Sequence, residues 1–268
     1  MNYTARYSLE FNPFIKNSKE ILIETSQYKE ALFRLNYLLQ TKGFGVLTGG
    51  PGKGKTTILR NWTASLNPAA YKIVYISLSS LTVLDFYRHL TEGLGQEARF
   101  FKTDNFKAIQ SAILRLTSEK KITPIIIIDE ANYLKNATLN DLKILFNFDM
   151  DSSDKAIILL AGLPQLNNTL NLNVHEPLRQ RITMNYHLDG LTKEEGKQYI
   201  LQKLDRAGCH IQVFEEAALE ALVNAANGIP RMLNKLANQS LLIGNSTNKN
   251  IIDTETILQA INDIELGD

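Results

Sequence analysis

Eight consecutive residues match the phosphate-binding pattern G-x-x-x-x-G-K-[ST]. They read Gly49-Gly50-Pro51-Gly52-Lys53-Gly54-Lys55-Thr56. The glycines allow backbone N–H groups to close around phosphate oxygens, Lys55 can reach the β- and γ-phosphates, and the Thr56 hydroxyl can hold Mg²⁺. We therefore expect ATP and Mg²⁺ as cofactors.

The flanking residues have the order that this motif requires. Residues 44–47 are an apolar run that predicts a strand, and residues 57–62 predict the opening of a helix. The N-terminus of that helix would point at the phosphates, so Thr57 joins the predicted nucleotide ligands. The alternative is a glycine-rich turn without a ligand, and the strand–loop–helix order argues against it.

A pair of carboxylates provides the second half of the predicted site. Residues 124–128 are a continuous apolar run, typical of a parallel strand that is buried on both faces. Asp129 and Glu130 follow directly. We expect Asp129 to hold Mg²⁺ together with Thr56, and Glu130 to orient and deprotonate the attacking water. The alternative, an acidic pair that faces solvent, is disfavoured by the phosphate loop upstream.

Phosphoryl transfer also requires positive charge at the transition state. Arg179 and Arg181 precede the last predicted strand, and Arg231 opens a predicted helix after Gly228. We expect these arginines to take part in catalysis, with Arg231 also contacting the nucleotide from a lid. For each of them the alternative is a solvated surface arginine.

The elements that position these residues alternate between strand and helix up to Gly190. Further strands are predicted at residues 71–76, 124–128, 156–161 and 183–188, the last of them nearer a sheet edge. Helices are predicted at 26–42, 57–62, 82–93 and 104–120. This alternation is typical of a doubly wound α/β sheet that binds ligand at the carboxyl ends of its strands.

The pattern is purely helical after Gly190. Thr192 and Glu195 form a capping-box pattern, helices are predicted at 214–226 and 230–243, and Asp253 can cap a fourth. We predict three parts: an N-terminal arm at 1–25, a nucleotide-binding α/β domain at 26–190 and a helical lid at 191–268. The Phe11-Asn12-Pro13-Phe14 segment of the arm should be held to the body by its rings.

Composition excludes several classes of protein. Hydrophobic residues make up 44% of the 268 residues, which indicates a globular protein, and the net charge of +1 does not by itself indicate a nucleic-acid or membrane partner, although a local DNA-binding patch could exist. Cys209 is the only cysteine, so no internal disulfide can form, and the histidines show no metal-ligand spacing. Without a signal peptide or a membrane-length apolar stretch, we expect a cytoplasmic protein with no membrane partner.

Taken together, the motifs resemble the core of an AAA+ ATPase. Residues 11–14, 43–49 and 161–166 further resemble the ExeA-type ATPases, a group that includes transposition regulators similar to TnsC, TniB and MuB. The resemblance extends over nearly the whole chain. It implies an α/β P-loop AAA+ core with a five-stranded parallel sheet flanked by helices, followed by a small C-terminal helical lid.

The resemblance also implies roles for single residues. Lys55 and Thr56 match the Walker A pair, and the two acids after the third strand match Walker B. Arg181, with Arg179 as an additional candidate, matches the arginine finger that reaches a neighbouring subunit, and Arg231 matches the sensor-2 arginine. The related segment usually reads Gly-Gln-Pro-Glu-Leu, whereas this chain has Leu163 and Gln165 there. Either hydrolysis is therefore slow or another residue acts as sensor 1.

A finger that acts in trans implies self-association in rings or helical filaments. In the transposition branch such filaments wrap double-stranded DNA and recruit a transposase. In the secretion branch a transmembrane helix and a peptidoglycan-binding domain follow the ATPase domain, and this chain ends at Asp268 with neither. We therefore expect an ATP-dependent, largely sequence-nonspecific DNA-binding regulator that oligomerises on DNA and recruits or activates a transposase. The alternatives are an ATPase that assists assembly of a secretion or cell-envelope complex, and a nucleotide-switched scaffold with little hydrolysis.

Contacts to DNA are expected from loops at the sheet edge, because hydroxyls and basic side chains suit phosphate contacts that do not read sequence. The candidates are Ser80, Thr82, Arg99, Lys102, Thr103 and Lys107. Binding through them would weaken with salt. For each residue the alternative is a solvated charge or a helix cap.

Overall fold

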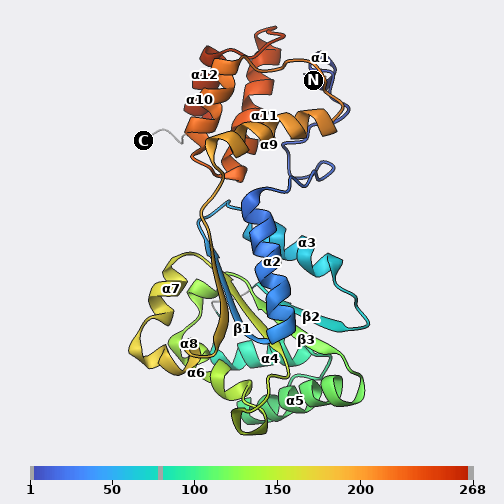
Figure 1. Ribbon diagram of the computed structural model, residues 1–268, viewed down its shortest axis with the longest axis vertical. Helices are drawn as coiled ribbons and strands as arrows, with labels where there is room; N and C mark the ends of the chain where they lie inside the picture. The colour runs from blue at the N-terminus through green and yellow to red at the C-terminus, as the bar shows by residue number, and fades with distance from the viewer. Residues whose placement is uncertain (1–2, 78–80, 265–268) are drawn as a thin grey trace. The chain divides into compact units, whose positions relative to one another are not determined.

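A five-stranded parallel sheet organises residues 30–188 of the computed structural model, which describes residues 3–77 and 81–264 (Figure 1). The strand order is β2-β3-β4-β1-β5. The strands are β1 (Gly43–Gly49), β2 (Tyr71–Ile76), β3 (Thr123–Ile128), β4 (Ile157–Gly162) and β5 (Ile182–Leu188). All five predicted strands are confirmed, and β5 lies at a sheet edge as expected.

Burial explains why the central strands lack an alternating pattern. Every residue of β1 and β4 is buried, as is every residue of β3 after Thr123, because helices cover both faces of the sheet. The edge strand β2 instead alternates toward its carboxyl end, where Val74 and Ile76 are buried and Tyr75 between them is exposed. The exposed side chains of β2 are therefore available for chemistry at the sheet edge.

Helices pack on the two faces of this sheet. The helical segments are α2 (Ser26–Thr41), α3 (Lys55–Ser65), α4 (Val83–Gly93), α5 (Lys102–Leu114), η1 (Arg115–Glu119), η2 (Ala131–Tyr133), α6 (Asn136–Leu145), η3 (Asp149–Asp151), α7 (Gln165–Leu170), η4 (Asn173–His175) and α8 (Glu176–Arg179). One core joins α4, α5 and α6 to the face that carries Val46. On the opposite face α2 approaches so closely that a methyl group at Gly45 would meet the side chain of Leu38. The helix predicted at 104–120 ends earlier, because its last turn widens into the π-helical segment η1.

Contacts within the chain delimit two units, which we call the sheet unit and the helical unit. The sheet unit comprises Glu30–Pro51 and Lys55–Leu188. The helical unit comprises the described parts of Met1–Lys29, Gly52–Gly54 and Asp189–Asp268. The division into arm, nucleotide-binding domain and lid stays a prediction of the sequence.

The helical unit is built from α1 (Tyr3–Arg6), α9 (Lys193–Arg206), α10 (Glu216–Ala226), α11 (Pro230–Ser246) and α12 (Thr254–Ile264). The predicted capping box is present, since Thr192 accepts the Glu195 N–H and the Glu195 carboxylate accepts the Thr192 N–H. Asp253 caps α12 by accepting the Thr256 N–H at 3.0 Å. Local capping chemistry therefore places these helix starts where the sequence indicated.

The N-terminal segment packs onto the helices of its own unit. The Arg6 guanidinium donates to the side-chain oxygens of three asparagines, Asn245, Asn248 and Asn250. Asn12 donates to the side chain of Asn238 at 2.7 Å. These bonds hold the segment to α11 and to the loop that follows it.

Lys203 is a buried lysine that holds the Pro13-Phe14 part of this segment. Its ammonium donates to the Pro13 carbonyl at 2.9 Å and to Asn234 Oδ1 at 3.1 Å. The rings of Phe14 and Tyr199 lie within cation–π distance of it. Burial lowers the pKa of Lys203 to about 8 from 10.5, with the Glu20 carboxylate acting in the opposite direction.

This pKa predicts a pH dependence of stability. Because the folded chain releases the Lys203 proton at lower pH than the unfolded chain, the free energy of unfolding should rise between about pH 8 and 10.5. The rise is on the order of 3 kcal/mol. Urea unfolding of the wild type and of Lys203→Met across this range measures it, and the variant should lack the rise. Lys235→Met, a change at an exposed lysine, is the control. If the free energy of unfolding depended on pH in the same way in the wild type and in Lys203→Met, the prediction would be wrong.

Candidate active site

The loop between β1 and α3 has the backbone conformation that its glycines permit. Gly52 and Gly54 have φ angles of +74° and +100°, in the left-handed region that favours glycine. A methyl group at Gly54 would meet nothing within 4 Å, so backbone conformation rather than space requires glycine there. Gly49 ends β1 and Lys55 begins α3, so the predicted order of strand, loop and helix is present.

The Lys55 ammonium is held by carbonyl groups at the start of the loop. It donates to Gly49 O at 2.6 Å and to Gly50 O at 3.1 Å. These bonds keep the positive charge at the carboxyl end of β1, where the predicted phosphate site lies. The ammonium has three donors and can redirect them to phosphate oxygens.

The two predicted metal-binding residues meet at the same sheet edge. Thr56 Oγ1, at the start of α3, donates to Asp129 Oδ2 at 3.2 Å, and Asp129 follows the last residue of β3. The Asp129 side chain is largely buried, with the residue 6% exposed. Its other oxygen, Oδ1, accepts the Glu130 N–H at 2.9 Å. A hydroxyl and a carboxylate oxygen are hard ligands that fit Mg²⁺.

The donor set is too small to hold a metal ion by itself. In the described ranges no group of three or more His, Cys, Asp or Glu residues is arranged around a common point. Mg²⁺ commonly binds through one or two protein ligands, several waters and the phosphates of a substrate. Thr56 and Asp129 therefore fit a Mg²⁺ ion that arrives with a nucleotide, and the bound ion would neutralise charge on the phosphate oxygens.

Glu130 has a strained backbone at the end of β3. Its φ and ψ angles are 53° and 35°, a left-handed conformation that is uncommon for a residue with a side chain. Its side chain is exposed, unlike that of the neighbouring Asp129. Such strain occurs at functional sites, and here it accompanies a buried and an exposed carboxylate at consecutive positions. One can then hold the metal ion while the other faces water.

Two asparagines missed by the sequence analysis join the elements around the phosphate loop. Asn167, on α7, donates to the buried Thr48 hydroxyl at 3.2 Å, and that hydroxyl also bonds His187 Nδ1 at 2.9 Å. Asn132 Oδ1 accepts the Leu163 N–H at 2.9 Å and so ties the loop after β3 to the end of β4. The sequence carried no signal for these contacts, because each joins residues that only the sheet order brings together.

Arg181 and the acidic residues lie at opposite ends of the parallel strands. It precedes β5, so it sits at the amino end of a parallel strand, whereas Asp129 follows the carboxyl end of β3. Its guanidinium donates to Lys143 O at 2.7 Å and to Phe146 O at 3.1 Å, at the end of α6. It also lies over the Phe44 ring. From this end Arg181 cannot reach the site of its own chain.

Arg179 lies on the same side of β5. It donates to the Asn171 carbonyl at 3.1 Å, at the end of α7. Both predicted finger residues thus complete helix C-termini, where cations are favourable. The structure brings neither of them to Asp129.

Arg231 lies beside a glycine of the phosphate loop, within the helical unit. Its backbone N–H donates to Gly52 O at 3.3 Å, and a methyl group at Gly52 would lie 2.9 Å from Cβ of Arg231. Arg231 is exposed and occupies the first turn of α11. In the same unit the Lys53 ammonium donates to the Asp189 carbonyl at 2.6 Å.

The predicted DNA-contacting residues have different surroundings in the structure. Ser80 lies outside the described residues. Thr82 caps α4 by accepting the Asp85 N–H at 3.2 Å, so the helix-cap alternative describes it. The Thr103 and Lys107 side chains are exposed on α5.

Arg99 and Lys102 have acidic partners. The Lys102 ammonium pairs with Asp141 on α6 at 2.5 Å, and Arg99 pairs with Glu97 at 3.7 Å. Binding of a DNA phosphate by either residue would compete with these ion pairs.

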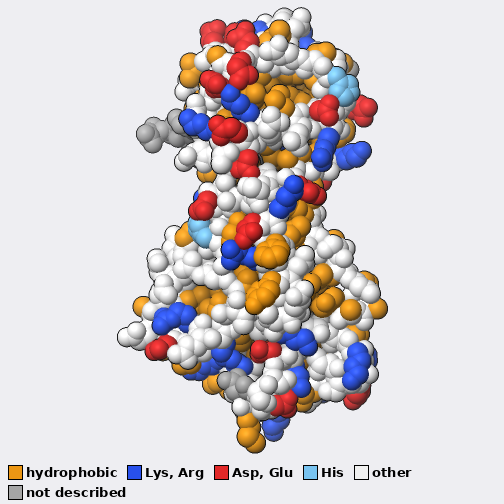
Figure 2. Space-filling model, viewed as in Figure 1, with side chains coloured by type: hydrophobic (Ala, Val, Ile, Leu, Met, Phe, Trp, Pro, Cys, Tyr) orange, Lys and Arg blue, Asp and Glu red, His pale blue; other side chains and the backbone are white. Residues whose placement is uncertain are grey.

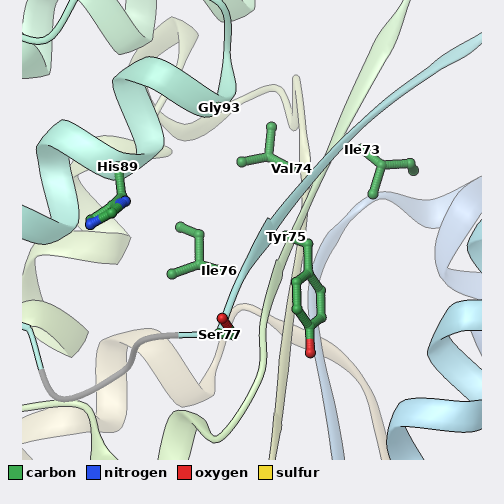
Figure 3. Close-up of a pocket in the computed structure, with 7 residues that line it drawn as sticks. All are labelled: Ile73, Val74, Tyr75, Ile76, Ser77, His89 and Gly93. Atoms are coloured by element: carbon green, nitrogen blue, oxygen red, sulfur yellow. The ribbon is translucent and has the colours of Figure 1, made fainter.

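A shallow pocket lies along β2 (Figure 3). It is lined by Ile73, Val74, Tyr75, Ile76, Ser77, His89 and Gly93. These residues include no carboxylate, lysine or arginine, so the pocket does not carry the phosphate chemistry. Figure 3 shows Val74 and Ile76 directed toward the side of α4, and Ile73 and Tyr75 directed to the other side of the strand.

Known proteins resemble this chain in sequence. Residues 38–170 match the model of a family described as AAA domain. General secretion pathway protein A of Aeromonas hydrophila is 32% identical over 247 residues, which are 90% of this chain and 44% of that protein. The chain thus spans less than half the length of this curated relative.

Solved structures share the fold at low sequence identity. Cdc6p of Pyrobaculum aerophilum superposes with a TM-score of 0.69 at 17% identity, covering 99% of this chain and 72% of that one. The ORC1 protein of Aeropyrum pernix in complex with DNA gives 0.65 at 15% identity, covering 94% and 68%. At such identities the likeness establishes the fold alone. In the described segments no helix has the length and apolar character needed to cross a bilayer.

Proposed function

Since this chain has the AAA+ P-loop fold, is an ATPase and is similar to General secretion pathway protein A, we propose that it drives assembly of a secretion or cell-envelope complex with ATP. The observation that carries ATP hydrolysis is the meeting of Thr56 and Asp129 at 3.2 Å beside Glu130. The similarity over 90% of the chain supports the secretion role. It supports that role better than the transposition role that the sequence analysis put first.

The proposed hydrolysis uses these residues in separate roles. Lys55 would bind the β- and γ-phosphates, while Thr56 and Asp129 would hold the metal ion. The Glu130 carboxylate accepts a proton from the water whose oxygen attacks the γ-phosphorus, as the bond to the bridging oxygen breaks. Arg231 is the proposed sensor-2 arginine, and within the helical unit its backbone N–H donates to Gly52 O.

Glu130→Gln should separate binding from hydrolysis. The amide cannot accept the proton, so turnover should fall by about 10²- to 10⁴-fold while ATP affinity changes little. Single-turnover hydrolysis and titration with a fluorescent ATP analogue measure the two quantities. Glu92→Gln, an exposed change on α4, is the control. Normal turnover in Glu130→Gln would refute the assignment, and a wild type that binds ATP without hydrolysing it would favour a nucleotide-switched scaffold.

We propose that the chain works as a ring or helical filament of its own copies. The finger candidates lie at the edge opposite the acidic residues, so only a neighbouring copy could supply them to a site. The solvent side of α2 also carries exposed aromatic residues, Phe33 at 69% and Tyr37 at 50% exposure, and Figure 2 shows hydrophobic side chains at the surface over this helix. Light scattering of Glu130→Gln with and without ATP tests for assembly.

Regulation of DNA transposition is the second candidate. It is favoured by the fold shared with a structure of ORC1 in complex with DNA and by exposed Thr103 and Lys107 on α5. If the chain regulates transposition, it should form an ATP-dependent complex with duplex DNA that weakens steeply with salt. Its partner should be a transposase. Gel-shift assays at two salt concentrations decide between the candidates, because the secretion role requires no DNA complex.

A further inference from the structure

We propose that Tyr75 is a positioning residue for the metal ion, because its hydroxyl holds the Asp129 carboxylate in the orientation that Mg²⁺ requires. The inference deepens the proposed ATPase function and rests on it. Tyr75 belongs to none of the sequence motifs that define the site. The pairing of strands in the sheet brings it to the site.

The pairing of β2 with β3 places Tyr75 next to Asp129. The strands run parallel with Tyr75 opposite Ile127 and Ile76 opposite Ile128, and Asp129 comes next along β3. Alternation along β2 turns the Tyr75 ring away from α4 (Figure 3). Its hydroxyl then reaches past the end of β3 and donates to Asp129 Oδ2 at 2.6 Å.

The Asp129 carboxylate is held at both oxygens. Oδ1 accepts the backbone N–H of Glu130, and Oδ2 accepts two hydroxyls, those of Thr56 and Tyr75. The Thr56 hydroxyl is the one that the motif assigns to the metal ion. When Thr56 turns to the metal, Tyr75 is the donor that continues to fix Oδ2. Outer partners of this kind orient metal ligands.

The exposure of Tyr75 argues against a purely packing role. The residue is 49% exposed, so its ring is not part of the core, whereas Val74 and Ile76 on the other face are buried.

Tyr75→Phe tests the inference because it removes only the hydroxyl. The Mg²⁺ concentration at half-maximal binding of fluorescent ADP should rise about 10-fold. Affinity for the same nucleotide in EDTA should stay unchanged, since the phosphate loop is intact. This split between metal-dependent and metal-independent binding would not follow from a general loss of structure. Tyr71→Phe, at the start of the same strand, is the matched control and should behave as wild type.

The outcomes separate this inference from the function on which it rests. An unchanged Mg²⁺ requirement in Tyr75→Phe, alongside a raised one in Thr56→Ala, overturns the role of Tyr75 and leaves the nucleotide site standing. An equal loss of affinity with Mg²⁺ and with EDTA also overturns it, because the hydroxyl would then act on structure. Failure of the wild type to bind ADP would overturn the proposed function itself.

Discussion

Lys55→Ala is expected to reduce ATP affinity by on the order of 100-fold or more. A hydrogen bond to a charged group contributes about 1.5–3 kcal/mol, and this ammonium can serve oxygens of two phosphates. In the structure the ammonium lies at the loop, 2.6 Å from Gly49 O. Isothermal titration calorimetry with a slowly hydrolysed ATP analogue measures the change.

The control must exclude a collapse of the loop, because Lys55 also holds the carbonyls of Gly49 and Gly50. Lys72→Ala removes an exposed lysine from the edge strand β2 and should leave affinity unchanged. Circular dichroism and urea unfolding of Lys55→Ala should show a folded protein. A folded Lys55→Ala that binds ATP as tightly as wild type would place the phosphate site elsewhere.

Arg181→Ala is expected to lower turnover by about 10³-fold while leaving ATP affinity nearly unchanged. The reason is that Arg181 lies at the amino edge of the sheet and would act on the nucleotide of a neighbouring copy. The guanidinium also caps α6, so the variant should lose about 1–2 kcal/mol of stability. Urea unfolding measures that loss separately from steady-state turnover.

Mixing two inactive variants tests whether the arginine acts in trans. Arg181→Ala keeps Glu130, and Glu130→Gln keeps Arg181, so a head-to-tail assembly of both contains complete sites. In an equal mixture roughly a quarter of the interfaces pair the intact acid with the intact arginine, and turnover should reappear in that proportion. Co-assembly without any recovered turnover would reject the finger assignment. Arg179→Ala in the same assay decides between the two candidate arginines.

The fold was predicted correctly, and the placement of the motif residues at the carboxyl ends of β1 and β3 was predicted as well, because both have local signals in the sequence. The phosphate loop is contiguous, and its glycines, lysine and threonine act through backbone conformations set within a few residues. The continuous apolar runs identify strands buried on both faces, and the acids that follow the third strand are placed by the strand itself. The capping residues of α9 and α12 are local signals of the same kind.

Other features of the structure could not be predicted from local sequence signals. The helical pattern over 104–120 does not reveal where α5 widens into a π-helical turn, because that depends on packing. Among the DNA-contact candidates, Lys102 pairs with Asp141 on α6, a neighbour that no local pattern indicates. The role of this side chain depends on a residue that the fold brings close.

The sequence alone determined the α/β class of the chain, and it predicted a nucleotide site with Lys55, Thr56, Asp129 and Glu130, because each of these residues belongs to a short motif with its own chemistry. Only the tertiary structure decided that Tyr75 and Thr56 share one oxygen of Asp129, and that Arg181 stands at the far edge. The physical reason is strand order. Neighbouring strands of the sheet are distant in the chain, so contacts between their ends follow from topology and not from local pattern.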